Sequence, residues 1–257
     1  MQMTILMTRM IRSKLAIIIT AAGSSTRIGG GIKKEYLPYK NGTVLSSCAQ
    51  TFLNACSRDF EITDFIVTCP KGGREECEKA LQSVNADCFA ALAMTEKKRS
   101  EMTDGRLPEI IIVEGADTRQ KSVYNGLLAV KGEPHLVLIH DGARPFISEE
   151  LIRTTIKTAA DFGAAVPGLT PTDTQKEINE DGFIVRHLVR SSLCAVQTPQ
   201  GFEFSRLLAA HERAALDGHE YTDDTEIWGA YCGRVKVVSG EVNNIKITYP
   251  ADLEKLS

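Results

Sequence analysis

The stretch Ala16-Ile-Ile-Ile-Thr-Ala-Ala-Gly-Ser-Ser-Thr-Arg-Ile-Gly-Gly-Gly-Ile-Lys-Lys-Glu-Tyr-Leu37 joins the pattern of a buried strand directly to a loop of small residues. The run 16–19 is wholly apolar, which is typical of a strand buried on both faces. The small residues 21–23 let backbone N–H groups come close to a polyphosphate. The cations Arg27, Lys33 and Lys34 would neutralise its charge. The stretch therefore predicts a nucleoside-triphosphate site.

This loop does not fit the two commoner phosphate motifs. A P-loop needs Lys followed by Ser or Thr after its glycines, and a dinucleotide fingerprint needs three spaced glycines that open a helix. A different nucleotide chemistry is therefore indicated. Taken alone, the loop could also be a plain connection, because Gly- and Ser-rich turns often follow a first strand.

Composition limits the class of protein. The chain has 257 residues, 43% of them hydrophobic and 25% charged, which is ordinary for a globular protein of one large or two smaller domains. A formal net charge of -3 argues against a general nucleic-acid binder. The seven cysteines show no Cys-x-x-Cys pair and favour reduced thiols, so we expect a cytoplasmic protein. No window approaches the roughly 20 apolar residues of a membrane span.

Alternating apolar runs and amphipathic stretches predict an α/β fold. The apolar runs are 16–19, 65–69, 110–113, 136–139 and 164–166, and the amphipathic stretches lie near 43–56, 73–84, 119–130 and 148–162. This pattern favours a Rossmann-like, doubly wound, mostly parallel sheet. Because ligands bind at the carboxyl ends of such strands, the turns that follow them should converge on one site.

Three segments stand outside this pattern. Residues 1–14 are expected to be a ragged N-terminus, with the natural start methionine undecided, and 15–257 a single domain. The polar segment of about 92–109 is interpreted as a solvated surface insertion. Short segments around the turn Asn179-Glu-Asp-Gly182 predict a β-arm of about 170–193 that projects from the body. A projecting arm often meets a partner subunit.

Asp141 and Arg144 follow the strand of 136–139. An acid at a strand tip could hold a divalent cation or a ribose hydroxyl. Arg144 could equally do no more than anchor that acid in its turn. At the next candidate turn, 113–123, Ser122 lies in the opening turn of a helix, where free N–H groups favour anions or base carbonyls. Asp117 or Thr118 could instead be a simple helix cap.

The last third of the chain supplies further polar candidates. Thr174, Lys176 and Arg190 bracket the predicted hairpin and could meet a second anionic group. The run 221–226 opens a helix, where its acids are favourable whatever the ligand. Lys246 is predicted to lie within a short apolar strand of 243–249, followed by Pro250 at the start of a terminal helix.

Read in order, seven motifs resemble the 2-C-methyl-D-erythritol 4-phosphate cytidylyltransferases of the non-mevalonate isoprenoid pathway, and together they cover nearly the whole chain. They are Ala21-Ala-Gly with Arg27 and Lys34-Glu-Tyr-Leu37, Asp117-Thr-Arg-Gln-Lys-Ser-Val-Tyr-Asn-Gly-Leu127, His140-Asp-Gly-Ala-Arg-Pro145, Asp173-Thr-x-Lys176, Gln197-Thr-Pro-Gln200, Thr222-Asp223 and Asn244-Ile-Lys-Ile-Thr248. Each motif is modest, but seven in order make coincidence improbable.

The resemblance implies transfer of CMP from CTP to methylerythritol phosphate, with release of pyrophosphate and with Mg²⁺ or another hard divalent cation as cofactor. It also implies a homodimer. The net charge and the lack of a long apolar run predict that the protein binds neither nucleic acid nor membrane. The implied catalytic residues are Arg27, Lys34 and Lys246. The implied nucleotide-binding residues are Ala21, Ala22, Gly23, Ala116, Asp117 and Ser122. The implied substrate-binding residues are Asp141, Arg144, Thr174, Arg190, Thr222 and Thr248, with Asp141 also beside the metal and the arm reaching a neighbouring subunit's site.

The chain departs from the family pattern at several positions. Lys33 stands where Pro is usual, Ser25 replaces a glycine, and Val189 replaces an aspartate before the arm arginine. At two further positions one small residue replaces another: Ala116 stands where glycine is common, and Gly142 stands where alanine is common. Two alternatives stay open: a ribitol 5-phosphate cytidylyltransferase, which would differ in its acceptor pocket, and a noncatalytic nucleotide-sensing module, which would be expected to lose the phosphate-binding cations.

Overall fold

Strand β1 (Ser13–Thr20) lies near the centre of an eight-stranded sheet in the computed structural model, which describes residues 12–23, 33–92 and 108–256. The strand order is β10-β7-β11-β6-β1-β4-β5, and β12 pairs with the remaining edge of β7. The further strands of this sheet are β4 (Phe60–Cys69), β5 (Ile110–Glu114), β6 (Leu136–Asp141), β7 (Ala164–Leu169), β10 (Ala195–Val196), β11 (Gln200–Glu203) and β12 (Lys236–Ser239).

Most neighbours in the sheet are parallel, as the sequence predicts. Strand β1 pairs in parallel with both β4 and β6, and β4 pairs in parallel with β5. The exceptions are β11, which is antiparallel to β6 and β7, and β10, which is antiparallel to β7. A mostly parallel sheet of this size needs crossover helices on its faces.

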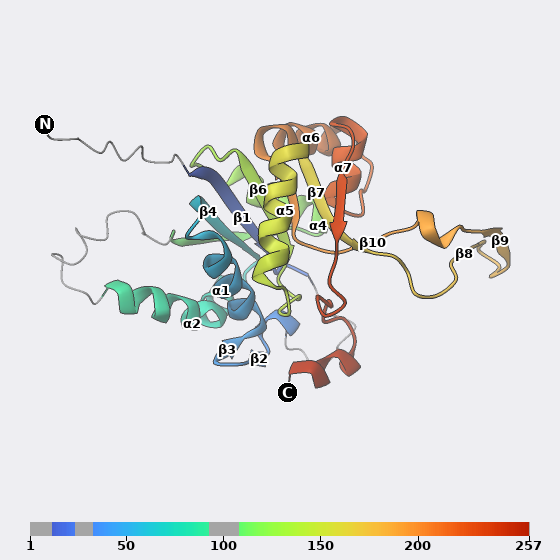
Figure 1. Cartoon of the computed structure of the whole chain (residues 1–257). Helices are drawn as coiled ribbons and strands as arrows, with labels where there is room; N and C mark the ends of the chain where they lie inside the picture. The colour runs from blue at the N-terminus through green and yellow to red at the C-terminus, as the bar shows by residue number, and fades with distance from the viewer. Residues whose placement is uncertain (1–11, 24–32, 93–107, 257) are drawn as a thin grey trace, which may run out of the picture.

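Helices cover both faces of the sheet (Figure 1). Alternate residues of β1 divide between two buried apolar clusters, as the two-residue repeat of a strand requires. Leu15, Ile17 and Ile19 pack with α1 (Val44–Cys56), α2 (Arg74–Leu92) and α5 (Glu149–Phe162). Ala16 and Ile18 pack with α4 (Arg119–Leu128), α6 (Phe204–Asp217) and α7 (Asp224–Tyr231). The predicted doubly wound arrangement is confirmed.

The predicted hairpin is present and projects from the body (Figure 1). It is formed by β8 (Lys176–Ile178) and β9 (Ile184–His187), which pair antiparallel around the turn 179–182. The Asn179 backbone N–H donates to the Phe183 carbonyl and the Asn179 side chain accepts from the Phe183 N–H, which closes this turn. A short 3-10 turn, η2 (Arg190–Ser192), follows the hairpin.

Smaller elements complete the described chain. They are η1 (Lys34–Tyr36), the two-stranded ribbon of β2 (Pro38–Tyr39) and β3 (Gly42–Thr43), and the terminal 3-10 helix η3 (Pro250–Leu256). Strand β1 begins at Ser13, two residues earlier than the predicted domain boundary. Of the predicted insertion, 93–107 lies outside the described residues. No helix in the described ranges combines the length and the apolar character that crossing a bilayer requires.

Candidate active site

The chain reverses its direction of progress across the sheet between β1 and β6. It runs from β1 through β4 to β5 on one side and then returns to place β6 on the other side of β1. Crevices at such reversals, outside the carboxyl ends of the strands, are the usual ligand sites of open α/β sheets. Thr20 ends β1 and Asp141 ends β6, so both lie at this crevice.

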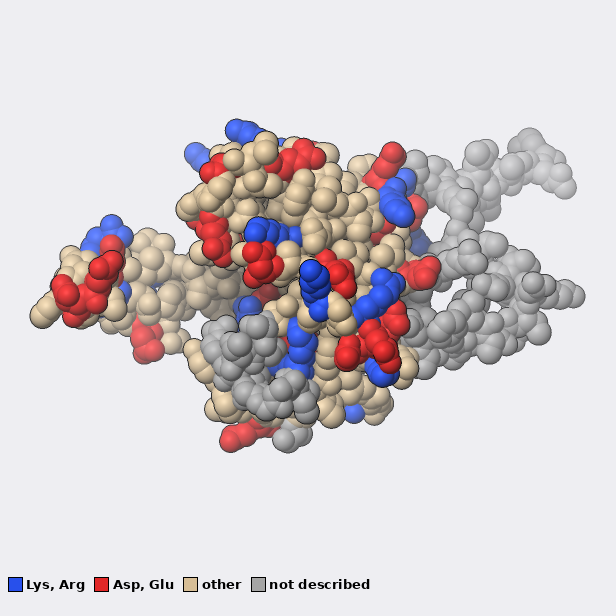
Figure 2. All heavy atoms as spheres, turned by 180° about the vertical axis from the view of Figure 1, so that it is seen from behind, with Lys and Arg blue, Asp and Glu red and all other residues tan. Residues whose placement is uncertain are grey.

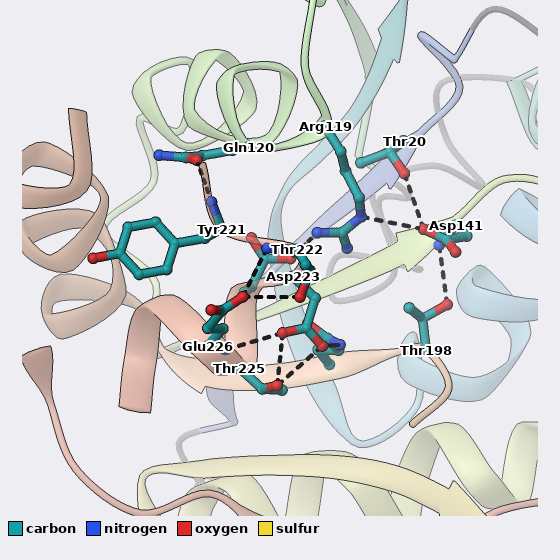
Figure 3. Close-up of polar contacts among 12 residues, drawn as sticks. Thr20, Arg119, Gln120, Asp141, Thr198, Tyr221, Thr222, Asp223, Thr225 and Glu226 are labelled. Carbon is teal, nitrogen blue, oxygen red and sulfur yellow. Dashed lines mark hydrogen bonds and ion pairs between the residues drawn. The ribbon is translucent and has the colours of Figure 1, made fainter. Parts of the chain in front are cut away.

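The Asp141 carboxylate is the centre of a cluster of cations at the crevice. Figure 3 shows Arg119, Thr20 and Thr198 around it. Lys246 Nζ lies 2.8 Å from Oδ2, and Arg144 Nε lies 3.7 Å from the same oxygen. Arg119 Nε lies 3.5 Å from Oδ1, the oxygen that also accepts a 3.5 Å hydrogen bond from the Thr20 hydroxyl. Only 9% of the Asp141 side chain is exposed. Three cations thus surround one buried carboxylate.

This cluster is suited to an anionic ligand. Burial by itself raises the pKa of Asp141, but attraction from Lys246, Arg119 and Arg144 outweighs it and holds the pKa well below its ordinary value. Two donors of the cluster, Arg119 Nη2 and Arg144 Nε, are buried and have no hydrogen-bond partner among the described residues. The excess of positive charge favours an anionic ligand such as a phosphate group. Lys246, 37% exposed, is the most exposed member of the cluster.

Buried His140 fixes the backbone around Asp141 through hydrogen bonds. Its Nδ1 lies 3.0 Å from the Thr198 hydroxyl and its Nε2 lies 3.2 Å from the Arg144 carbonyl oxygen. The same Thr198 hydroxyl oxygen accepts a hydrogen bond from the Asp141 backbone N–H at 3.1 Å. Burial lowers the pKa of His140 to about 4, so the imidazole is neutral at pH 7. These contacts fix the backbone on which Asp141 and Arg144 stand.

The segment that carries Lys246 is held by side chains and by one backbone hydrogen bond, from the Ile247 N–H to the Ala143 carbonyl at 2.8 Å, rather than by a sheet. The predicted strand at 243–249 is wrong, since the structure assigns no strand there. Gln197 instead donates to the carbonyl oxygens of Glu241 and Asn244, at 2.9 and 3.2 Å, and Arg144 Nη1 donates to the Asn244 carbonyl at 2.7 Å. These polar contacts replace a sheet partner and bring Lys246 to Asp141.

The predicted nucleotide-binding loops lie against each other. Gly115 permits this approach, because a Cβ there would lie 2.4 Å from the Cβ of Ala22 and 2.7 Å from Ser122 Oγ. The Ser122 hydroxyl accepts from the Ala116 N–H at 2.9 Å and donates to the Thr118 carbonyl at 2.8 Å. Ser122 therefore shapes the loop 115–118, and Thr118 is the N-cap of α4.

Lys33 lies over the first loop. Its ammonium donates to the carbonyl oxygens of Ala21 and Gly23, the former at 3.2 Å. Burial lowers the pKa of Lys33 from its ordinary value. Lys33, which departs from the family pattern, therefore stabilises the first loop by binding backbone carbonyls of that loop. On the second loop, Asp117 pairs with Lys121 at the surface.

The remaining predicted catalytic residues are placed as follows. Arg27 lies outside the described residues, as does Ser25, which is a departure from the family pattern and not a predicted catalytic residue. Lys34 is buried in η1, and its charge contributes to lowering the pKa of Asp252, after the hydrogen bonds from the backbone of Tyr249 and Thr248. Thr248 lies beside Lys246, because its hydroxyl donates to the Lys246 carbonyl at 3.0 Å, and its backbone N–H donates to Asp252 at 2.8 Å.

The other predicted substrate-binding residues are not joined to the Asp141 cluster. Thr174 is exposed on the arm, and Arg190 Nη1 donates to the Thr172 carbonyl at 2.7 Å across the base of the arm. The Thr222 hydroxyl donates to Glu226 at 2.8 Å, immediately before α7. One chain therefore assembles Asp141, Arg144 and Lys246 but leaves the arm residues facing solvent.

Arg119 and Asp224 were not predicted as site residues. Arg119 Nη1 lies 2.8 Å from Asp224 Oδ2, and the Asp224 side chain is fully buried. The available signal was the helix position of Arg119, one turn before Ser122 and thus on the same face of α4. His211, on α6, then approaches the other oxygen of Asp224 at 3.1 Å.

The residues present do not form a magnesium site by themselves. The described part of the chain contains no group of three or more His, Cys, Asp or Glu side chains that could hold a metal ion. The Asp141 carboxylate is paired with cations on both oxygens. The residues at the crevice instead fit an ion that is held mainly by substrate phosphates and takes at most one carboxylate oxygen from the protein. Such binding is common for Mg²⁺.

Fold and cluster together define a class of protein. A doubly wound sheet, small-residue loops at the strand ends and side-chain cations in place of a P-loop indicate an α/β nucleotide-binding protein that handles phosphate groups.

Comparison with known proteins identifies the family within this class. The family model for IspD, 2-C-methyl-D-erythritol 4-phosphate cytidylyltransferase, matches residues 15–256, and the chain belongs to this family. The 2-C-methyl-D-erythritol 4-phosphate cytidylyltransferase of Clostridium novyi (strain NT) is 38% identical over 242 residues, covering 94% of each chain. The corresponding protein of Desulforamulus reducens is 33% identical over 239 residues, covering 93% of this chain and 92% of its own.

Solved structures agree with this assignment. The 4-diphosphocytidyl-2C-methyl-D-erythritol synthase of Anaerococcus prevotii is 29% identical, has a TM-score of 0.74 and is matched over 95% of this chain and 94% of its own. The cytidylyltransferase of Thermus thermophilus is 28% identical, with a TM-score of 0.66 and coverage of 93% and 95%. The chain is thus a nucleotidyltransferase enzyme.

Proposed function

We propose that this enzyme transfers a cytidylyl group from CTP to 2-C-methyl-D-erythritol 4-phosphate. A phosphate oxygen of the acceptor forms a bond to the α-phosphorus of CTP, and the bond from that phosphorus to the bridging oxygen breaks. The electron pair leaves with pyrophosphate, and 4-diphosphocytidyl-2-C-methyl-D-erythritol is formed. Membership of the family and the cation cluster around Asp141 support this reaction.

The chemistry needs cations more than a general base. The attacking phosphate oxygen is already ionised at neutral pH, so no side chain has to remove a proton. The barrier comes from bringing two polyanions together, and fixed positive charge lowers it when it binds the transition state more tightly than the ground state. Lys246 and Arg144 supply that charge at the crevice, and Arg27 and Lys34 are proposed to act on the triphosphate.

The two adjacent loops are proposed to hold the nucleoside. Residues 21–23 and 115–118 offer backbone groups at the carboxyl edge of the sheet, in a shape that Gly115 and Ser122 maintain. We propose that Mg²⁺ arrives with the triphosphate, with Asp141 as its one protein ligand. When bound, the ion would neutralise charge on the phosphates.

The arm is proposed to complete the acceptor site of a second subunit in a homodimer. Its apolar side chains are exposed in the single chain: Ile178 (62%), Phe183 (70%), Ile184 (54%), Val185 (56%) and Val189 (66%). Figure 2 shows the arm standing clear of the body. Exposed apolar surface of this extent favours a protein partner, and Thr174 and Arg190 would then reach the acceptor phosphate. A reducing, cytoplasmic location is proposed from the free thiols of the described cysteines.

One assay tests this function and its alternatives. Pyrophosphate release is measured with CTP, UTP, ATP or GTP, each paired with methylerythritol phosphate or ribitol 5-phosphate. We expect rapid release only with CTP and methylerythritol phosphate. Faster release with ribitol 5-phosphate would identify the other cytidylyltransferase. Binding of CTP with no release in any combination would identify a nucleotide-sensing module.

A further inference from the structure

Arg119 joins two buried carboxylates that belong to different elements. Its guanidinium reaches Asp141, at the end of β6, through Nε and Asp224, in the first turn of α7, through Nη1. The Arg119 side chain is 26% exposed, whereas Asp141 and Asp224 are 9% and 0% exposed. In Figure 3 Arg119 lies between Asp141 and the chain at Thr222–Asp223. One side chain therefore couples the Asp141 cluster to the start of α7.

The second carboxylate is itself firmly held. Asp224 Oδ1 lies 3.1 Å from His211 Nε2, while Oδ2 lies 2.8 Å from Arg119. Burial alone raises the pKa of Asp224, but attraction and hydrogen bonds from Arg119 and His211 lower it below its ordinary value. Asp224 is therefore a charged, buried anchor that restricts the orientation of the Arg119 guanidinium plane.

Each oxygen of the Asp141 carboxylate contacts a different set of side chains. Arg119 and Thr20 hold Oδ1, and Lys246 and Arg144 approach Oδ2. Contacts on Oδ1 restrict rotation of the carboxylate about its χ2 angle. That restriction fixes where Oδ2 lies, and Oδ2 in turn determines the position of the Lys246 ammonium. A planar guanidinium can serve two carboxylates at once, which a single ammonium of lysine does less well.

We propose that Arg119 is a positioning residue for the transfer reaction. Anchored by Asp224, Arg119 fixes the orientation of the Asp141 carboxylate, and this carboxylate in turn fixes the position of Lys246. This inference rests on the proposed function. Misplacement of a reacting group by about 1 Å can reduce a rate by about 10²-fold. Loss of Arg119 should therefore lower kcat, while the affinity for CTP changes little.

The test must separate positioning from folding. Replacing Arg119 alone leaves two buried carboxylates without their shared cation, which can unfold the chain. The double variant Arg119→Met with Asp224→Asn removes the buried pair together and should retain cooperative thermal unfolding. Arg119→Lys is the second variant, because it keeps the charge but not the fork. Lys79→Met is the control, since Lys79 pairs with Glu75 on the exposed side of α2.

Steady-state pyrophosphate release with CTP and methylerythritol phosphate gives the result. We expect kcat to fall about tenfold in the double variant and at least fivefold in Arg119→Lys, with the KM for CTP within threefold of wild type and the control unchanged. If the double variant does not fold, Arg119→Lys decides by the same criteria.

Two results would overturn the inference: a folded variant whose kcat falls less than fivefold, or one whose KM for CTP rises while kcat is kept. Inactivity of the wild-type enzyme would instead refute the proposed function, so the two failures are distinguishable.

Discussion

The Asp141 carboxylate stays ionised because the neighbouring cations stabilise its charged form. Moderate acid therefore does not disrupt the cluster. The pKa of Asp141 is well below its ordinary value, so its attraction to Lys246, Arg119 and Arg144 persists throughout the neutral range. Desolvation of such a buried carboxylate is costly, and structures retain it where its partners are well placed. The cluster is therefore a functional arrangement more than a source of stability.

His140 should make the stability of the fold depend on pH. Its pKa is about 4 in the folded chain because burial disfavours the charged ring, against about 6.5 when unfolded. Between these values the unfolded chain binds more protons, so the free energy of unfolding decreases as the pH falls. The expected slope approaches about 1.4 kcal/mol per pH unit. Urea denaturation at pH 7, 6 and 5 measures it.

The control for this prediction is a comparison of two histidine variants. His140→Gln removes the buried ring and should flatten the slope between pH 6.5 and 4.5, although its stability at pH 7 will also be lower. His219→Gln changes an exposed ring, 61% exposed, and should keep the wild-type slope. Equal slopes in all three proteins would show that His140 does not carry the pH dependence.

The residues of the site were predictable where a motif surrounded them. Asp141, Arg144 and Lys246 stand in short apolar or turn contexts that mark them as unusual, and the structure brings them together. Arg119 was missed because a charged residue in the first turn of a helix is usually solvated. The buried position of Arg119 depends on its ion pair with Asp224, which is 105 residues away in the chain, and no local sequence pattern reveals such a pair.

At the scale of elements, the arm is the part whose role depends most on assembly. Within the described residues, its strands pair only with each other, and the one hydrogen bond of the Arg190 side chain goes to the Thr172 carbonyl at the base of the arm. Val189, which replaces the usual aspartate, gives Arg190 no carboxylate neighbour at that position. The guanidinium is thus held by a backbone carbonyl and is accessible to an incoming phosphate.

Arg190→Ala should mainly raise the KM for methylerythritol phosphate. The guanidinium is proposed to bind the acceptor phosphate, and a charge-assisted hydrogen bond of this kind contributes about 1.5–3 kcal/mol, which is about 10- to 100-fold in affinity. The KM for CTP should stay within threefold of wild type. Initial-rate kinetics with each substrate varied in turn measure both constants. A change confined to CTP would place Arg190 at the nucleotide instead.

The strands predicted from sequence are those with continuous apolar runs. β1, β4, β5, β6 and β7 are buried between helices, so composition alone marks them. β10, β11 and β12 were not predicted, because each is only two to four residues long, too short for an apolar run to be recognised. The segment 243–249 has a strand-like pattern, but Gln197 and Arg144 both donate to the Asn244 carbonyl, and the Ile247 N–H donates to Ala143, so its backbone forms no sheet ladder.

At the scale of the whole molecule, the proposed homodimer explains why an arm should carry apolar side chains into solvent. A single chain has a mass of 28.1 kDa, and sedimentation equilibrium should give twice that mass for the wild type. Ile184→Asp should shift the enzyme towards the single chain, because a charge in a buried interface is costly. Leu216→Asp, at an exposed site on α6 away from the arm, should leave the mass unchanged.

A wild-type protein that sediments as a single chain at micromolar concentration would contradict this assembly. Equal masses for Ile184→Asp and wild type would place the interface elsewhere. If the arm completes the acceptor site, Ile184→Asp should also raise the KM for methylerythritol phosphate in parallel with dissociation.

The central claim is that cations gathered around Asp141 at the β1–β6 crevice perform the cytidylyl transfer. The most direct test is the turnover of Lys246→Met with CTP and methylerythritol phosphate. Lys246 is 37% exposed and touches Asp141, so we expect its ammonium to contact a phosphate group that binds at the crevice. We predict a fall in kcat of about 10²-fold, with Lys79→Met, an exposed site on α2, unchanged. A folded Lys246→Met enzyme with a kcat within threefold of wild type would contradict the account.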